Sequence, residues 1–232
     1  MIKKAACFLY SFLLIVMLVG GCADQSTKKT SKDNRLHLAF VVNLPDPFWS
    51  YARAGCYKAE QDFNVKCDFK IPFDGSSSEQ NRILETLIQQ DTIKGIAVSP
   101  LDPKNQTEIL NDVAAKVKLV CHDSDAPDSN RLFYLGTNNY SGGRQVGKLI
   151  KETLPDGGQI MIYVGKMDVL NAQQRREGVI DELKEGVSAS AKPSGLPSTA
   201  IMAGKYIILD TRTDQGDRAT AKKNAENTLK KY

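Results

Sequence analysis

The fold of this chain is indicated by residues 36–49, which read LHLAFVVNLPDPFW. The apolar and β-prone residues from Leu36 to Asn43 predict a buried strand. Two prolines soon afterwards prevent the strand from continuing, since proline lacks the backbone N–H that a sheet needs. We therefore expect Asp46, Phe48 and Trp49 to lie at the carboxyl end of this strand, where open α/β sheets bind ligands.

The aromatic pair Phe48 and Trp49 has two alternative roles. Flat rings beside the carboxylate of Asp46 suit a polyhydroxylated ring, because the aromatic faces cover its C–H side while the carboxylate accepts hydroxyl protons. Alternatively, both rings pack into the core at the start of a helix, as aromatic side chains commonly do. These residues alone leave both alternatives open.

The rest of the chain alternates short apolar runs with amphipathic helical patterns, which predicts an α/β fold with parallel sheets and right-handed crossovers. Asp102 followed by Pro103 predicts a helix start, and the pattern over 217–231 predicts a closing helix. The expected strands are Leu36–Asn43, Val65–Ile71, Gly95–Ser99, Lys118–His122, Leu132–Gly136, Gln159–Val164 and Lys205–Asp210.

Polar residues follow these strands at their carboxyl ends. Because parallel strands bring those ends to one edge, the side chains should converge on a crevice, although some must be only caps and turns. They are Asn43, Asp46, Ser99, Asp102, Asp123, Ser124, Asp125, Asn138, Asn139, Asn171 and Asp214.

Residues 1–21 have the pattern of an export signal, with two lysines before an apolar run that is too short to span a bilayer comfortably. The end of this signal together with the next residue, Val19-Gly20-Gly21-Cys22, resembles a bacterial lipobox. This resemblance implies that Cys22 becomes the lipid-bearing N-terminus. An uncleaved anchor or a signal cut elsewhere is the alternative. Either way, we expect the folded part outside the cytoplasm, in the periplasm and anchored by lipid to a bacterial membrane.

Residues 22–35 are expected to be the lipidated cysteine and a flexible tether, because 23–35 contains no large apolar side chain. The chain has 31 basic and 27 acidic residues, and two of the lysines belong to the export signal. The charge is thus close to balanced, so no nucleic-acid partner is expected.

Three cysteines remain after loss of the signal and lipidation of Cys22. They are Cys56, Cys67 and Cys121. We expect them to be buried free thiols, and a Cys56–Cys67 bridge is the alternative.

Four blocks of sequence carry a family resemblance. They are Asn43 with Asp46–Trp49, His122–Pro127, Gly136–Tyr140 and Asn171–Gly178. In order and spacing the chain resembles the ribose-binding-protein type of periplasmic sugar-binding proteins, whose core LacI-type repressors share. The resemblance implies a periplasmic-binding-protein-like type I fold, in which two Rossmann-like lobes close on a sugar and deliver it to the permease of an ABC-type importer.

The resemblance also implies a set of ligand contacts. Phe48 and Trp49 match the stacking aromatics, Asp123 the carboxylate that accepts sugar hydroxyls, and Arg175 a donor from the second lobe. At Ser124 the ribose-specific pattern implies an arginine, so the identity of the sugar stays open. No catalytic residue, metal or cofactor is implied. The expected ligand-binding residues are Asn43, Asp46, Phe48, Trp49, Asp123, Ser124, Asn171 and Arg175.

The same comparison predicts a sugar-binding lobe over 36–137 and a partial second lobe over 138–232, because the family pattern continues beyond Tyr232. An incomplete second lobe would bind sugar weakly or not at all, and a non-functional fragment is an alternative.

Other functional classes have weaker support. Residues 142–149 nearly match a phosphate-binding P-loop, but Leu149 stands where Ser or Thr is needed, and close helix packing is the alternative. No HExxH, GxSxG or CxxC spacing indicates an enzyme. A LacI-type regulator would need a helix-turn-helix where the signal and tether lie. A sensory binding lipoprotein that signals to a membrane receptor stays open.

Overall fold

The computed structural model describes residues 33–186 and 193–232. The predicted export signal, Cys22 and most of the tether lie outside these ranges. Residues 35–232 form one unit, which contains two separate sheets. Within the described ranges, no helix has the length and apolar character needed to cross a membrane.

The first sheet is parallel, with strand order β2-β1-β3-β4-β5. The chain passes from β1 to β2 on one side and then returns to place β3 on the other side of β1. This reversal creates a topological switch point between β1 and β3. The strands are β1 (Leu36–Val41), β2 (Val65–Lys70), β3 (Ile93–Val98), β4 (Lys118–His122) and β5 (Tyr134–Leu135).

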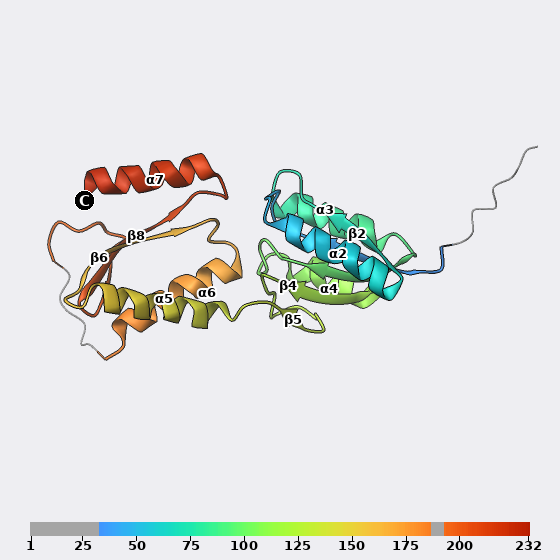
Figure 1. Cartoon of the computed structure of the whole chain (residues 1–232), viewed down its shortest axis with the longest axis horizontal. Helices are drawn as coiled ribbons and strands as arrows, with labels where there is room; N and C mark the ends of the chain where they lie inside the picture. Colours follow the sequence, from blue (N-terminus) through green and yellow to red (C-terminus); the bar gives the residue numbers. More distant parts are fainter. Residues whose placement is uncertain (1–32, 187–192) are drawn as a thin grey trace, which may run out of the picture. The chain divides into compact units, whose positions relative to one another are not determined.

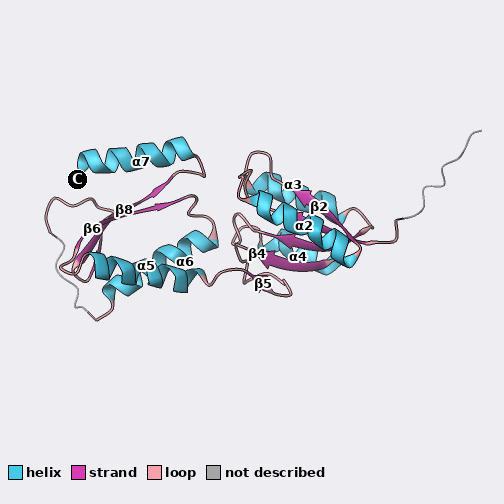
Figure 2. Ribbon diagram, viewed as in Figure 1, coloured by secondary structure: helices cyan, strands magenta, loops and turns pink. Residues whose placement is uncertain are grey.

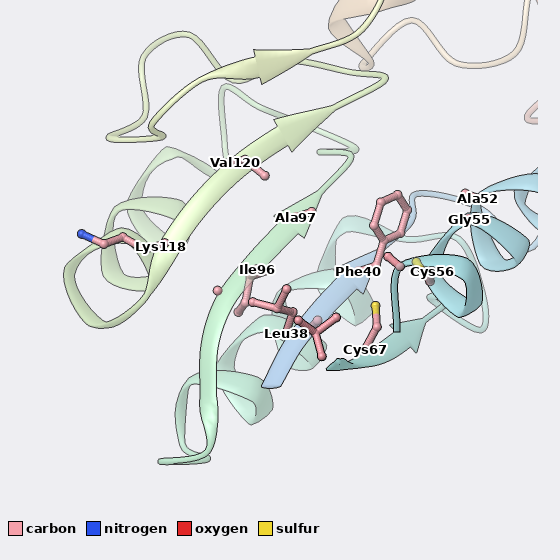
Figure 3. A pocket seen from close by; sticks show the side chains of 14 residues that line it. Leu38, Phe40, Ala52, Gly55, Cys56, Cys67, Ile96, Ala97, Lys118 and Val120 are labelled. Carbon is pink, nitrogen blue, oxygen red and sulfur yellow. The ribbon is translucent and has the colours of Figure 1, made fainter. Parts of the chain in front are cut away.

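Three helices accompany this sheet (Figure 1): α2 (Trp49–Phe63), α3 (Ser77–Ile88) and α4 (Thr107–Lys116). Alternate residues of a strand point to opposite faces. Ala39 and Val41 of β1 therefore pack with Leu84 and Leu110 from α3 and α4 in a buried core. Leu38 and Phe40 of β1 instead face the side that carries α2 (Figure 3).

The second sheet has the order β6-β8-β7. Its strands are β6 (Gly158–Val164), β7 (Ile201–Ala203) and β8 (Tyr206–Thr213), and only β6 and β8 are parallel. The expectation of parallel sheets is wrong for β7, which runs antiparallel to β8. Only Gly204 and Lys205 connect the two strands, and so short a loop joins neighbours only as a hairpin. Gly204 adopts the positive φ of 63° that such a turn favours.

Helices α5 (Asn139–Thr153) and α6 (Leu170–Lys184) lie side by side along the second sheet (Figure 2). Glycines allow their close approach. A Cβ atom on Gly143 would lie 2.1 Å from the carbonyl oxygen of Arg175, and one on Gly178 would lie 2.2 Å from that of Tyr140. The P-loop-like glycines thus lie inside α5, and the alternative of close helix packing is confirmed.

Helix starts differ in how well the sequence predicts them. The last helix, α7 (Arg218–Lys231), is confirmed, with the Asp217 carboxylate accepting the Thr220 N–H at 2.7 Å. The start at Asp102 is wrong, because α4 begins only at Thr107. The carboxylate of Asp102 instead accepts the Asn105 N–H at 3.2 Å in a preceding turn.

Candidate functional site

The candidate site begins at the carboxyl ends of three adjacent strands. Asn43 follows β1, Ser99 follows β3 and Asp123 follows β4. Since β3 lies between β1 and β4 in the sheet, these three residues meet at one edge, beside the switch point where such sheets bind ligands.

Hydrogen bonds join these residues into one group, the Asn43–Ser99–Asp123 cluster. The amide Nδ2 of Asn43 donates to Ser99 Oγ at 3.2 Å and to Asp123 Oδ2 at 3.4 Å. Ser99 Oγ in turn donates to Asp123 Oδ2 at 3.0 Å. Asn43 and Ser99 are buried, whereas Asp123 is half-buried. Asn43 and Ser99 therefore both donate to Oδ2 of Asp123, and the carboxylate can still accept further hydrogen bonds from a ligand.

Asp123 is unfavourably placed in two respects. Its backbone φ is +58°, in the left-handed region that non-glycine residues seldom adopt. Burial raises the pKa of its carboxyl group, and hydrogen bonds from Ser99 and Asn43 and the charge of Arg175 only partly oppose this effect. A carboxylate that is short of solvation gains from hydroxyl donors brought by a ligand. Backbone strain of this kind is concentrated at functional sites.

Two buried glutamines support the cluster from below. Gln80 Nε2 donates to the carbonyl oxygens of Val42, at 3.0 Å, and Ser99, at 2.9 Å. Gln106 Nε2 donates to Gln80 Oε1 at 3.0 Å, and both glutamines accept the N–H of Leu101. These bonds set the positions of the chain segments that leave β1 and β3. Sequence reasoning missed both residues, although Gln80 lies on the same helical face as the buried Leu84 and Leu87.

Phe48 and Trp49 differ in exposure. Trp49, the first residue of α2, is only 6% exposed, and its Nε1 donates to Asn43 Oδ1 at 3.2 Å. Its ring makes edge contacts with Phe48 and His122, with centroids 5.1 and 5.5 Å apart. Phe48 is 59% exposed. The alternative of core packing thus explains the burial of Trp49, whereas the Phe48 ring is accessible to solvent. Contact of either ring with a ligand remains a prediction.

His122 lies behind the site, next to Asp123 in sequence. Its ring stacks on Phe40 at a centroid distance of 4.1 Å, and its Nε2 lies 3.2 Å from the carbonyl oxygen of Val41. Burial lowers the pKa of His122 to about 4. The imidazole is therefore neutral near pH 7 and must carry its proton on Nε2 to donate to Val41.

The remaining predicted residues of the first sheet have local partners or none. Asp46 Oδ1 accepts the Phe48 N–H at 2.7 Å and so shapes the loop after β1. Ser124 is fully buried, and its Oγ has no hydrogen-bond partner within the described part of the chain. Two further residues at strand ends are a cap and a turn: Asn138 accepts the Ser141 N–H at 3.0 Å and Asp214 the Gly216 N–H at 2.8 Å.

Two predicted residues come from α6. Asn171 Nδ2 donates to Asp123 Oδ2 at 3.4 Å and so joins the Asn43–Ser99–Asp123 cluster. Arg175 Nε donates to Asn139 Oδ1 at 2.8 Å, a partner that sequence reasoning did not assign. Asn43, Asn171 and Arg175 all line a cavity of about 810 Å³, which is within the size range of small-molecule sites.

A family model for the periplasmic binding protein domain matches residues 39–232. This chain belongs to that family. The α/β fold class and the resemblance seen in the sequence are thereby confirmed. The expectation of a binding protein rather than an enzyme agrees with this membership, which also implies an extracytoplasmic location.

A curated relative is distantly similar in sequence. The ribose import binding protein of Haemophilus influenzae is 23% identical over 157 residues, which are 65% of this chain and 52% of the relative. The chain therefore spans about half the length of this curated relative.

Solved structures show the same fold. A solute-binding protein of Burkholderia graminis in complex with D-arabinose has a TM-score of 0.73 and 24% identity, over 84% of this chain and 62% of that one. A glucose-galactose binding protein of Geobacillus stearothermophilus has a TM-score of 0.72 and 22% identity, over 85% and 65%. A myo-inositol binding protein of Caulobacter has a TM-score of 0.71 and 20% identity, over 84% and 61%.

Proposed function

We propose that this protein captures a mono- or small saccharide outside the cytoplasm and delivers it to an ABC-type importer, while Cys22 anchors it to the membrane. The observation that carries the proposal is the half-buried Asp123 carboxylate, held by Asn43 and Ser99 at the switch point of a parallel sheet. A carboxylate in this position favours a neutral ligand with several hydroxyl donors over an anion.

The surrounding groups complement a sugar in chemically distinct ways. Asn43 and Asn171 each provide an amide beside Asp123. The guanidinium of Arg175 can donate to a ring oxygen or a hydroxyl, because it carries donors in a planar fork. The exposed ring of Phe48 can cover the C–H face of the ligand. Together these groups recognise hydroxyl direction as well as an apolar face.

The relatives support this class of ligand without selecting one member of it. Ribose, D-arabinose, glucose or galactose, and myo-inositol appear in their names, and all of them are small polyols. Because Ser124 stands where the ribose-specific pattern implies an arginine, ribose is not favoured over the others.

Calorimetric titration of the purified protein with pentoses, hexoses and myo-inositol tests the proposal. We expect saturable heat with at least one polyol and a clearly weaker affinity for it in Asp123→Asn. Asp62→Asn is the matched control, since Asp62 is exposed at the end of α2 remote from Trp49, pairs with Lys58 and should leave binding unchanged. The absence of heat with every polyol at millimolar concentration, or equal affinity in Asp123→Asn, would remove the proposed function.

Sensing is the second candidate, because a binding protein can present its ligand-bound form to a receptor instead of a permease. The XylFII–LytSN complex, whose TM-score against this chain is 0.73 at 20% identity, is a case in which a protein of this fold binds a second protein. Neighbouring genes for a permease and an ATPase would favour import, and a neighbouring receptor gene would favour sensing.

A further inference from the structure

Two cysteines lie on one wall of a second cavity, next to the first sheet. Cys56 belongs to α2 and Cys67 to β2, and both are free thiols of intermediate exposure. They line a cavity of about 450 Å³ together with apolar side chains of β1 and β3, among them Leu38 and Ile96. Figure 3 shows Cys56 and Cys67 next to each other where the helix faces the strand.

The packing of α2 on β2 accounts for this proximity. The face of α2 that meets the cavity consists of small residues, with Ala52, Gly55 and Ala59 around Cys56. Small side chains allow the helix backbone to approach the strand closely, which a disulfide requires because its Cα atoms must lie about 4.4–6.8 Å apart.

A hydrogen bond also holds the two elements together at this level. Glu60 Oε1 accepts the backbone N–H of Cys67 at 2.8 Å. Glu60 lies one helical turn after Cys56, so both side chains point to the same side of α2. The native fold thus holds Cys56 of α2 and Cys67 of β2 next to each other as free thiols on the wall of one cavity.

We propose that Cys56 and Cys67 are a redox-active pair that forms a disulfide between α2 and β2 when the protein meets a disulfide oxidant. The family implies a location outside the cytoplasm, where disulfides form and persist. This inference does not depend on the sugar ligand.

The chemistry is a two-step thiol–disulfide exchange. The Cys56 thiolate attacks one sulfur of a disulfide oxidant such as oxidised glutathione, and one glutathione leaves. The Cys67 thiolate then attacks the Cys56 sulfur of the mixed disulfide and releases the second glutathione. Two cysteine thiols are oxidised and one glutathione disulfide is reduced to two thiols, so electrons and protons balance.

The order of these steps follows from the environment of the two thiols. The neighbouring Cys67 thiol lowers the pKa of Cys56, whereas the Cys56 thiol and burial raise the pKa of Cys67. Cys56 is therefore the better first nucleophile. Cys121 serves as an internal comparison, because it is fully buried and burial raises its pKa to about 11.

Peptide mapping tests the pair directly. The purified full-length protein is incubated with oxidised glutathione in its native state and then unfolded in denaturant. Free thiols are alkylated, and the protein is digested with trypsin. Cleavage after Arg53, Lys58, Lys66 and Lys70 releases Cys56 and Cys67 on separate peptides, 54–58 and 67–70. We expect these peptides to be joined, with a mass two hydrogens below their sum, while Cys121 stays alkylated.

Single variants test both the pairing and the order of attack. Cys67→Ser should accumulate glutathione on residue 56, because the resolving thiol is missing, whereas Cys56→Ser should take up little. Cys121→Ser is the matched control and should still give the joined peptides.

The protein with a Cys56–Cys67 disulfide should also unfold at a temperature higher by about 5–10 °C, because the disulfide closes a loop and so reduces the conformational freedom of the unfolded chain.

The pair would be refuted if Cys56 and Cys67 stayed fully alkylatable in the folded wild type after exposure to oxidised glutathione. It would equally be refuted if both kept stable glutathione adducts, since a paired thiol must resolve the mixed disulfide.

Discussion

Asp123 combines features that reduce stability but favour binding. It has a left-handed backbone conformation and a half-buried carboxylate, and its partners Ser99 and Asn43 do not fully replace lost water. A residue of this kind stabilises the complex more than the free protein, because a ligand supplies the missing donors.

The Asp123→Asn variant should therefore be more stable and bind less. Since burial raises the pKa of Asp123, the folded protein holds this proton more strongly than the unfolded chain, and stability falls as pH rises through the folded pKa. At pH 7 the variant avoids this cost and should have the higher Tm. Below the ordinary aspartate pKa of about 3.8 both proteins are neutral at this position, and the difference should vanish.

Thermal unfolding at several pH values from 3 to 8 measures this effect, and calorimetry with the bound polyol should show affinity weaker by about 1.5–3 kcal/mol. Asp74→Asn is a control for which the change in Tm should have the opposite sign, because hydrogen bonds from Ser76 lower the pKa of Asp74. Its Tm should be lower than wild type at pH 7, with the difference shrinking in acid. A lower Tm for Asp123→Asn at pH 7 would contradict the account of its burial.

At the scale of elements, the contact between α5 and α6 is determined by glycine positions. Gly143 faces the backbone of α6 with no room for a Cβ atom, whereas Gly142, its neighbour in α5, has no atom within 4 Å of that position. Substitutions at these two adjacent glycines therefore distinguish the effect of packing between the helices from the effect of the residue on helix stability.

Gly143→Ala should destabilise the protein by about 1–3 kcal/mol, because the inserted methyl group forces the two helices apart. Gly142→Ala, in the same helix, should stabilise it by about 0.4–1 kcal/mol, since alanine reduces the freedom of the unfolded chain. Urea unfolding followed by circular dichroism compares the two variants. If both substitutions stabilised the protein equally, α5 and α6 would not approach as closely as their glycines indicate.

At the scale of the whole molecule, the expected membrane anchor concerns Cys22, which lies outside the described residues. The Val19-Gly20-Gly21-Cys22 ending of the export signal motivates the prediction that Cys22 is acylated. A bacterium expressing the protein with labelled palmitate should incorporate label into the wild type and not into Cys22→Ala. Cys56→Ala provides the control for loss of a different thiol and should be labelled. Equal labelling of Cys22→Ala and wild type would exclude the anchor.

Much of the fold could be predicted from local patterns. The strand Lys118–His122 is predicted with its observed limits, and the closing helix, predicted over 217–231, begins one residue later, at Arg218. Apolar runs, helical periodicity and turn residues act between near neighbours in the chain, so they are readable without a structure. The β7–β8 hairpin was not predicted, because its first strand is only three residues long.

The sequence by itself determined that this is an alternating α/β chain and that polar residues follow its strands. Only the tertiary structure decided which of them meet. Asn43 bonds to Ser99 and Asp123 across 56 and 80 residues of chain, while Asn138 is a helix cap. Tertiary packing also buried Trp49 and left Phe48 exposed. Such outcomes depend on strand order and on contacts between distant segments, and no local pattern contains that information.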